Sequence, residues 1–297
     1  MNTASLIRLL ALGAIWGSSF AFMRATAPTF GPPLLIELRV AIAAAFPTVV
    51  GFWLGKRVDW KKDWRFFLLI GFVNTALPFT LFAYAALTLP ASLLAIFNSL
   101  APLFGALIGA VWFGTRITRT AALGLALGVI GVSGLTYESI SHATLRGGPQ
   151  QALLAVLAGA GASLCYGLAA NWIRARPQKV DAFATAQGTL WGASMLMLLT
   201  FPTWPLPVTA TTPQWLAVAV LGFMCTGAAY LLHFRLIADI GVTRALTVTF
   251  LIPVFGVLWG ILFLDERIGP GLIIGGPLIL IGTALANGLT LRSLRSA

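Results

Sequence analysis

The stretch LAPLFGALIG at residues 100–109 returns, 151 residues later, as LIPVFGVLWG at residues 251–260. Leu, Pro, Phe, Gly, Leu and Gly recur at the same places in both stretches. A proline inside a helix removes a backbone donor and clashes with the preceding turn, which costs about 3 kcal/mol in a soluble helix. A chain that writes so unfavourable a feature twice is built from two related halves.

The similarity extends well beyond these two stretches. Residues 64–134 align with residues 215–285 without a gap, and 17 of the 71 positions are identical. The identical positions include the pairs Trp64/Trp215, Gly71/Gly222, Thr75/Thr226, Pro102/Pro253, Gly105/Gly256 and Arg116/Arg267. Upstream, Trp16-Gly17 pairs more loosely with Tyr166-Gly167. We therefore predict two repeats, one over residues 1–140 and one over residues 141–297.

The composition places these repeats in a lipid bilayer. Apolar residues make up 59% of the 297 residues and charged residues 9%, whereas soluble domains have about 45–50% and about 25%. A membrane-spanning helix needs roughly 20 mostly apolar residues. By this measure we expect ten spans, at residues 5–24, 33–54, 65–87, 90–113, 120–138, 151–173, 183–202, 214–235, 242–264 and 270–291.

An odd number of spans in each repeat determines how the two repeats are related. With five helices each, the second repeat starts on the opposite side of the membrane from the first, which makes an inverted-topology repeat. Such repeats are typical of secondary transporters, whose substrate site lies near the membrane midplane between the halves. The predicted fold class is thus an all-α integral membrane protein of ten transmembrane helices in two inverted five-helix repeats.

The net charge of +11 has a membrane explanation rather than a nucleic-acid one. Of the 19 basic residues, 15 fall at ends that are cytoplasmic if both termini are cytoplasmic. Only Arg24, Arg146 and Arg267 fall outside, and Arg39 lies within a span. The positive-inside rule accounts for this asymmetry. We expect no nucleic-acid partner, and a bacterial inner (plasma) membrane location with multiple passes.

Several further segments resemble the EamA family of the drug/metabolite transporter superfamily, in its ten-helix form. The resemblance rests on IWGSSFAFMRA in the first span, ELRVAIAAA in the second, FLDERI after the ninth, and the Pro-bearing and Gly-rich spans of each half. It implies alternating-access transport, and the nearest group within the branch is the YddG-like exporters of amino acids and related metabolites. One departure is that the Gly-Glu expected after the fourth span reads Gly114-Thr115, whereas the second half keeps Glu266.

The uncharged polar residues gather near the predicted midplane, which indicates a water-accessible cavity because buried polar groups need partners. The candidate substrate-binding residues are Trp16, Ser19, Asn74, Pro78, Phe79, Phe82, Asn98, Pro102, Ser163, Tyr166, Tyr230, Thr249 and Pro253. They lie on spans 1, 3, 4, 6, 8 and 9. The resemblance implies that spans 2 and 7 act as gates and that spans 5 and 10 form a scaffold. The same faces would arise if residues had drifted on lipid-exposed surfaces.

Charged and glycine residues form a second candidate set, with gating or structural roles. It comprises Glu37, Arg39, Gly105 and Gly256. Glu37 and Arg39 are two residues apart and so do not pair along the helix. For Arg39 a structural or gating role competes with snorkelling to the interface. His233 is a candidate proton relay, with a simple interfacial role as the alternative.

Rival functions find less support in the sequence. Gly-Val-Ser-Gly at residues 131–134 resembles an intramembrane protease string, but the topology places neither His142 nor His233 at the depth of Ser133. A channel would need charged or carbonyl rings. We therefore expect no enzyme, no cofactor and no metal site. We expect export of small metabolites, foremost amino acids including aromatic ones; the alternatives are hydrophobic or cationic drugs, nucleosides or sugars. The oligomeric state is left open, and a monomer is compatible with the sequence.

Overall fold

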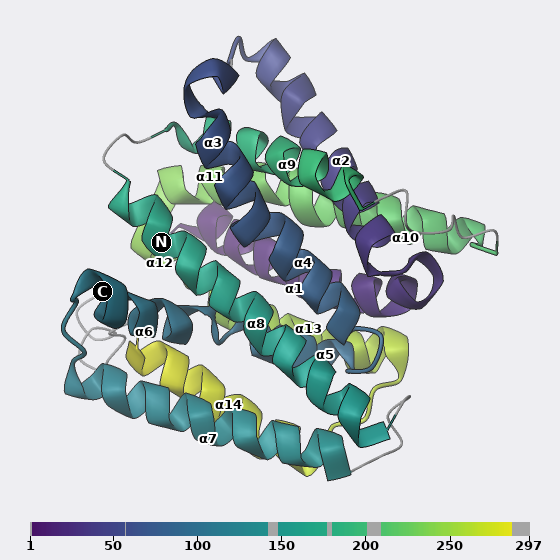
Figure 1. Ribbon diagram of the computed structural model, residues 1–297, viewed down its shortest axis with the longest axis vertical. Coiled ribbons are helices and arrows are strands. Elements are labelled where there is room, and N and C mark those ends of the chain that lie inside the picture. Colours follow the sequence, from purple (N-terminus) through teal and green to yellow (C-terminus); the bar gives the residue numbers. More distant parts are fainter. Residues whose placement is uncertain (1, 57, 142–147, 177–179, 201–208, 287–297) are drawn as a thin grey trace.

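The computed structural model describes residues 2–56, 58–141, 148–176, 180–200 and 209–286 (Figure 1). Within these ranges the chain forms helices joined by short turns, and no β-strand is present. The predicted all-helical class is therefore confirmed.

Seven helical segments are long and apolar enough to cross a membrane. They are Thr3–Phe30, Pro32–Trp53, Trp60–Ala85, Ala91–Phe113, Arg119–Glu138, Gly148–Ala175 and Thr212–Ile240. Two further apolar helices, Val248–Leu264 and Pro270–Ala286, are shorter. The fold is that of an integral membrane protein.

Several of these segments consist of more than one helical element. The first half contains α1 (Thr3–Phe30), α2 (Pro32–Trp53), α3 (Trp60–Gly71), η1 (Phe72–Ala76), α4 (Leu77–Ala85), α5 (Ala91–Asn98), α6 (Ala101–Phe113) and α7 (Arg119–Ser141). The second half contains α8 (Gly148–Ala175), α9 (Ala182–Leu198), α10 (Thr212–Gly222), η3 (Phe223–Ala228), α11 (Ala229–Ile240), α12 (Val242–Ala245), α13 (Val248–Leu264) and α14 (Pro270–Ala286).

The first helix is longer than the sequence pattern predicts. The prediction ended it at Arg24, whereas α1 continues to Phe30. The charge of Arg24 indicated a helix end at this point. The charge is accommodated within the bundle instead, because Nη1 of Arg24 donates to the carbonyl of Ala86, 2.6 Å away. The predicted span ends at 201–202 and 287–291, and the cations Arg57, Arg146, Lys179, Arg292 and Arg295 together with His142, lie outside the described residues.

Two pairs of glycines let helices of opposite halves cross closely. On α1, a Cβ added to Gly17 would lie 2.8 Å from the backbone nitrogen of Gly256 on α13. On α8, a Cβ added to Gly167 would lie 2.6 Å from the backbone nitrogen of Gly105 on α6. Gly105 and Gly256 are partners in the 151-residue repeat, so the two halves build the same crossing. Small residues at such crossings are the usual means of close packing in membranes.

The two halves also share an unusual helical turn. A π-helical segment interrupts the third predicted span at Phe72–Ala76 and the eighth at Phe223–Ala228. These two segments begin 151 residues apart, as the sequence repeat requires. Single π-turns inside α-helices are rare and occur frequently at functional sites.

The repeated prolines predict two symmetry-related kinks, at Pro102 and Pro253, that frame the substrate site; the structure places the two prolines differently. In the first half the chain breaks at Ser99–Leu100, and Pro102 stands in the first turn of α6, where a missing N–H is harmless. In the second half the break falls earlier, before Val248, and Pro253 lies inside α13. The break in the first half is satisfied by neighbours, because Thr283 donates to the carbonyl of Ser99 at 2.7 Å.

The helices α7 and α14 run side by side along one edge of the molecule (Figure 1). A Cβ on Gly131 of α7 would lie 2.7 Å from the carbonyl oxygen of Gly275 on α14, and the reciprocal substitution meets the carbonyl of Gly131 at the same distance. These two elements correspond to the fifth and tenth predicted spans. Their mutual backbone contact is what a rigid scaffold requires.

Candidate functional site

A cavity of about 700 Å³ lies between the two halves. Its walls come from α1, α2, the η1–α4 and η3–α11 segments, α5, α6, α8 and α13, with Leu246 before α13 and Ala286 at the end of α14. Arg39 brings the second predicted span into the wall and Ala286 brings the tenth, so the lining is wider than the six spans we expected. A cavity of this size suits a small metabolite.

Most of the candidate substrate-binding residues line this cavity. The lining ones are Trp16, Ser19, Asn74, Phe79, Phe82, Asn98, Pro102, Tyr166, Tyr230 and Thr249. Among the gating candidates, Arg39 and Gly105 also line it. Pro78, Ser163, Pro253, Glu37 and Gly256 do not form part of its wall, and all five are buried elsewhere in the bundle.

Ser163 illustrates why a polar midplane residue need not face the cavity. Its hydroxyl donates to the carbonyl of Phe97 at 2.6 Å, just before the break between α5 and α6. Asn171 has a related role further along α8, because its amide donates to the carbonyls of Gly105 and Gly167, each at 2.9 Å. Both side chains thus satisfy backbone groups at the contact between α8 and the broken fourth span.

Repeat partners face each other across the cavity with different chemistry. The pairs in which both members line it are Asn74/Cys225, Phe79/Tyr230, Phe82/His233, Asn98/Thr249 and Ala101/Ile252. Each pair is related by the same 151-residue offset. The frame of the site is therefore duplicated, while the side chains that would meet a solute are not.

Arg39 and Glu37 lie in separate environments. The guanidinium of Arg39 donates from Nε to the hydroxyl of Thr226 at 2.9 Å, and its carbon lies 3.8 Å from the centre of the Phe79 ring. Glu37 accepts a hydrogen bond from Ser194 of α9 at 2.9 Å. The Arg39 side chain is buried, and its guanidinium is held inside the bundle by Thr226 and Phe79.

His233 and Ser133 lie in unrelated places. His233 lines the cavity with its ring centre 5.1 Å from that of Trp16. Ser133 is exposed on α7, and its hydroxyl donates to the carbonyl of Val129 at 2.9 Å. The string at residues 131–134 thus belongs to the contact of α7 with α14 and not to the cavity.

Sequence reasoning left several lining residues out of the candidate set. They include Met23, Thr115, Asn171, Arg174, Cys225 and Thr226. The repeat carried a usable signal for two of them: Cys225 is the partner of Asn74, and Thr226 is the partner of Thr75 inside the π-turn. Thr115 and Arg174 lie at the mouth of the cavity. Their place in its wall follows only from the packing of α6 against α8, which the sequence pattern did not predict.

The two ends of the cavity differ. Thr115, Arg174 and Leu246 line it at the end that is predicted to be cytoplasmic, and all three are exposed. At the other end, Leu89 is fully buried, Nε2 of Gln214 donates to the hydroxyl of Thr29 at 2.7 Å, and the carboxylate of Glu266 accepts from the backbone N–H of Ala91 and of Ser92. As far as the described residues form it, the cavity is open at one end and closed at the other.

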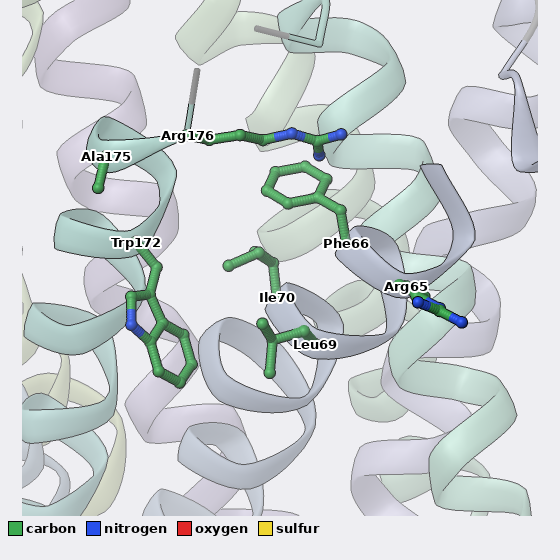
Figure 2. A pocket seen from close by; sticks show the side chains of 7 residues that line it. All are labelled: Arg65, Phe66, Leu69, Ile70, Trp172, Ala175 and Arg176. Carbon is green, nitrogen blue, oxygen red and sulfur yellow. The ribbon is translucent and has the colours of Figure 1, made fainter. Parts of the chain in front are cut away.

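A second, smaller pocket of about 350 Å³ lies between α3 and α8 (Figure 2). Figure 2 shows the guanidinium of Arg176 lying over the ring of Phe66, with Trp172, Leu69 and Ile70 below it. Arg176 also forms an ion pair with Asp63. Arg176 is therefore paired within the protein, and apart from Arg65 the rest of the wall is apolar, so this pocket is less suited to bind a polar solute than the central cavity.

Comparisons with known proteins agree with this arrangement. Residues 3–137 and, separately, residues 153–288 match the EamA-like transporter family. The chain is 23% identical over 291 residues to the "Uncharacterized transporter YvbV" of Bacillus subtilis (strain 168), covering 96% of this chain and 92% of that protein. It is 25% identical over 287 residues to the "Probable terminal-alkyne amino-acid exporter" of Streptantibioticus cattleyicolor, covering 95% and 93% respectively.

The fold also occurs among solved structures. One crystal structure superimposes with a TM-score of 0.64 on 98% of this chain and over 100% of its own length, at 20% identity. At that identity the likeness concerns the fold alone.

Proposed function

The chain belongs to the EamA-like transporter family, and on this premise we propose that it exports small metabolites, foremost amino acids, by alternating access. The observation that carries the proposal is the central cavity of about 700 Å³, lined by repeat partners from both halves and open at only one end. A carrier needs such a site, whereas a channel needs a continuous pore.

The proposal includes the topology of ten spans in two inverted halves, residues 1–140 and 141–297, with both termini in the cytoplasm. Its support is the two separate family matches, the π-turns at Phe72–Ala76 and Phe223–Ala228, and the duplicated glycine crossing. The excess of Lys and Arg at the predicted cytoplasmic ends supports the orientation. The same charge pattern is what a bacterial inner-membrane protein would carry.

On this topology the structure corresponds to an inward-open state. The exposed mouth at Thr115 and Arg174 then faces the cytoplasm, from which an exporter takes up its substrate. The closed end at Leu89 and Glu266 faces outward. Transport requires the reverse arrangement as well, which an inverted repeat supplies by exchanging the conformations of its two halves.

Amino acids are the substrate class that the lining favours. Aromatic rings of Trp16, Phe79, Phe82, Tyr166 and Tyr230 provide apolar contact area. Amides and hydroxyls of Asn74, Asn98 and Thr249 can fix the orientation of a polar head group. The name of the Streptantibioticus relative, a probable amino-acid exporter, supports the same class.

Transport by purified protein in liposomes tests the proposal. We expect saturable uptake of L-phenylalanine and L-leucine, together with acceleration by substrate on the opposite side. A panel that adds uridine, glucose and ethidium, with and without a pH gradient, separates amino acids from the nucleoside, sugar and cationic-drug alternatives. Uptake that does not saturate, with no acceleration from the opposite side, would contradict a carrier.

Alanine substitutions test the site itself. Asn74→Ala, Asn98→Ala and Thr249→Ala each remove one polar group from the cavity wall. Because a typical hydrogen bond contributes about 0.5–1.5 kcal/mol, we expect each to weaken apparent affinity by about twofold to tenfold. Ser133→Ala, on the exposed face of α7, is the control and leaves transport unchanged. Normal transport by all three cavity variants would remove the cavity as the substrate site.

A further inference from the structure

The guanidinium of Arg39 is the most deeply buried cation in the cavity wall. The residue is only 4% exposed, and its Nη1 lies 3.4 Å from the sulfur of Met23 while Nε donates to Thr226. A guanidinium has five N–H donors, and these contacts occupy two of its three nitrogens. Within the described residues, Nη2 has no hydrogen-bond partner from the protein.

No carboxylate of the protein neutralises this charge. All eight acidic residues of the chain lie within the described ranges, and their ion pairs there join Asp239 to Arg8 and Arg235, and Asp63 to Arg176. Glu37, the nearest acid along the helix, is engaged by Ser194. A buried charge without a counter-charge is expensive in free energy, so an anion bound beside Arg39 would be stabilised.

The orientation of Arg39 is fixed from the opposite half. Thr226 accepts from Nε of Arg39 and donates its own proton to the carbonyl of Leu221, five residues back, at 3.0 Å. This bond exists because the chain is wound as a π-helix at η3 (Phe223–Ala228). The repeat partner Thr75 stands in the equivalent π-turn of the first half, where its hydroxyl is buried and has no partner within the described residues. The repeat thus provides two equivalent threonines, Thr75 and Thr226, and only Thr226 contacts the buried cation.

The other charged residue of the cavity lining is also positive. Arg174 stands at the open mouth, and no Asp or Glu is among the lining residues. The guanidinium carbon of Arg39 lies over the ring of Phe79, as in a cation–π contact. Two arginines and no carboxylate line the cavity, so its charged groups favour an anion over a cation.

We propose that Arg39 binds the carboxylate of the transported solute, so that the cavity selects carboxylic acids over their neutral or cationic analogues. This inference rests on the proposed transport function and names the chemical group recognised. The planar guanidinium matches a carboxylate through two parallel N–H···O bonds, which a lysine ammonium cannot reproduce. The aromatic residues around it then contact the side chain of the acid.

Matched pairs of acids and amides test the inference. Purified protein is studied with L-phenylalanine against L-phenylalaninamide and L-leucine against L-leucinamide, by uptake into liposomes and by thermal unfolding. We expect the acids to be taken up and to raise the unfolding temperature, and the amides to do neither. Equal uptake or equal stabilisation by acid and amide would overturn the inference.

Three variants locate the effect at Arg39. Arg39→Met removes the charge and should weaken the acid's apparent affinity by about tenfold to a hundredfold, because hydrogen bonds to charged groups contribute about 1.5–3 kcal/mol. Arg39→Lys keeps the charge without the fork and should fall between Met and the parent chain. Arg119→Gln removes one exposed charge away from the cavity and serves as the control. If Arg39→Met does not fold, Arg39→Lys and the acid–amide comparison still decide.

The outcomes separate the inference from the transport proposal. Saturable uptake of a nucleoside or sugar, with no preference for acids, overturns carboxylate recognition and leaves the carrier in place. Stabilisation by acids that is lost in Arg39→Met, without uptake of any solute, keeps the anion site and overturns transport. If acids neither bind nor move, the inference is wrong.

Discussion

The turn after α6 and the turn after α13 have the same backbone and opposite consequences. Gly114 and Asp265, which are repeat partners, both adopt the left-handed conformation, with φ of 65° and 52°. The next residue in each turn, Thr115 or Glu266, donates its N–H to a glycine carbonyl at 3.1 Å, from Gly109 or Gly260. The two loops are thus the same structure built at the two ends of the cavity.

Their side chains decide which end is closed. The carboxylate of Glu266 passes over Gly260 and accepts from the N–H groups of Ala91 and Ser92, at the start of α5. Thr115 is exposed and lines the open mouth. Thr115 has no carboxylate with which to hold the corresponding start of the other half. The repeat thus supplies the same backbone turn twice, and a carboxylate bridges the two halves at only one of these two turns.

The largest expected effect concerns the glycine crossings that support the two ends. A Cβ on Gly256 would overlap the Cβ of Ala95, closer than two such atoms lie in folded proteins, whereas a Cβ on Gly105 would lie at an ordinary 3.7 Å from Gly167. Gly256→Ala should therefore destabilise the protein by about 1–3 kcal/mol through overpacking, and Gly105→Ala by less than about 0.5 kcal/mol. Thermal unfolding in detergent measures both.

The Gly256–Gly105 pair carries its own control, because the same substitution is made at repeat partners. Equal loss of stability in the two variants would show that the crossings are equally tight and would remove this difference between the ends. A variant with Gly17→Ala, whose Cβ would meet the backbone of α13 at 2.8 Å, should resemble Gly256→Ala.

A smaller effect is expected when the carboxylate at the closed end is removed. Glu266→Ala deprives the N–H groups of Ala91 and Ser92 of their acceptor, and loss of such a helix cap costs about 0.5–2 kcal/mol. The closed end should open more often. With Cys165 and Cys225 replaced by alanine, the buried Leu89→Cys should react several times faster with a membrane-impermeant maleimide applied from outside.

Asp265→Asn is the matched control for this experiment. It removes an acidic charge one position away, in the same turn, and asparagine tolerates the left-handed conformation that Asp265 adopts. Labelling of Leu89→Cys should stay at its original rate. If Asp265→Asn and Glu266→Ala raised the rate equally, the cap on α5 would not be what holds this end closed.

The sequence predicted the parts of this arrangement that depend on local pattern. The apolar spans, the 151-residue repeat and a large part of the cavity wall follow from periodicity and from matching positions such as Phe79 and Tyr230. The sequence also showed that the repeat partners Thr115 and Glu266 differ between the two halves. It did not show their contacts, because Glu266 reaches a helix start 174 residues earlier in the chain.

Expectations failed where tertiary packing overrides a local rule. A proline was expected to kink both α6 and α13. The chain instead breaks at Ser99–Leu100, where Thr283 satisfies a backbone carbonyl, and before Val248, upstream of Pro253. Ser163 was expected to face substrate, but it lies outside the cavity wall and its hydroxyl donates to the carbonyl of Phe97. Single-sequence patterns carry no information on such partners.

The smallest expected effect comes from making the two turns alike. Thr115→Glu gives the open end the carboxylate that the closed end has. By the repeat, its hydrogen-bond donors on closure would be the backbone N–H groups of residues 242–243, which correspond to Ala91 and Ser92. Part of the gain is offset by the exposed Arg174 at the same mouth, which competes for the new carboxylate while the end is open. We therefore expect the closed state of this end to gain only about 0.5–1 kcal/mol. This corresponds to labelling of Leu246→Cys from the cytoplasmic side that is about twofold to fivefold slower. Thr115→Gln has the same length without the charge and should slow labelling less, whereas faster labelling in Thr115→Glu would mean that the carboxylate holds the mouth open.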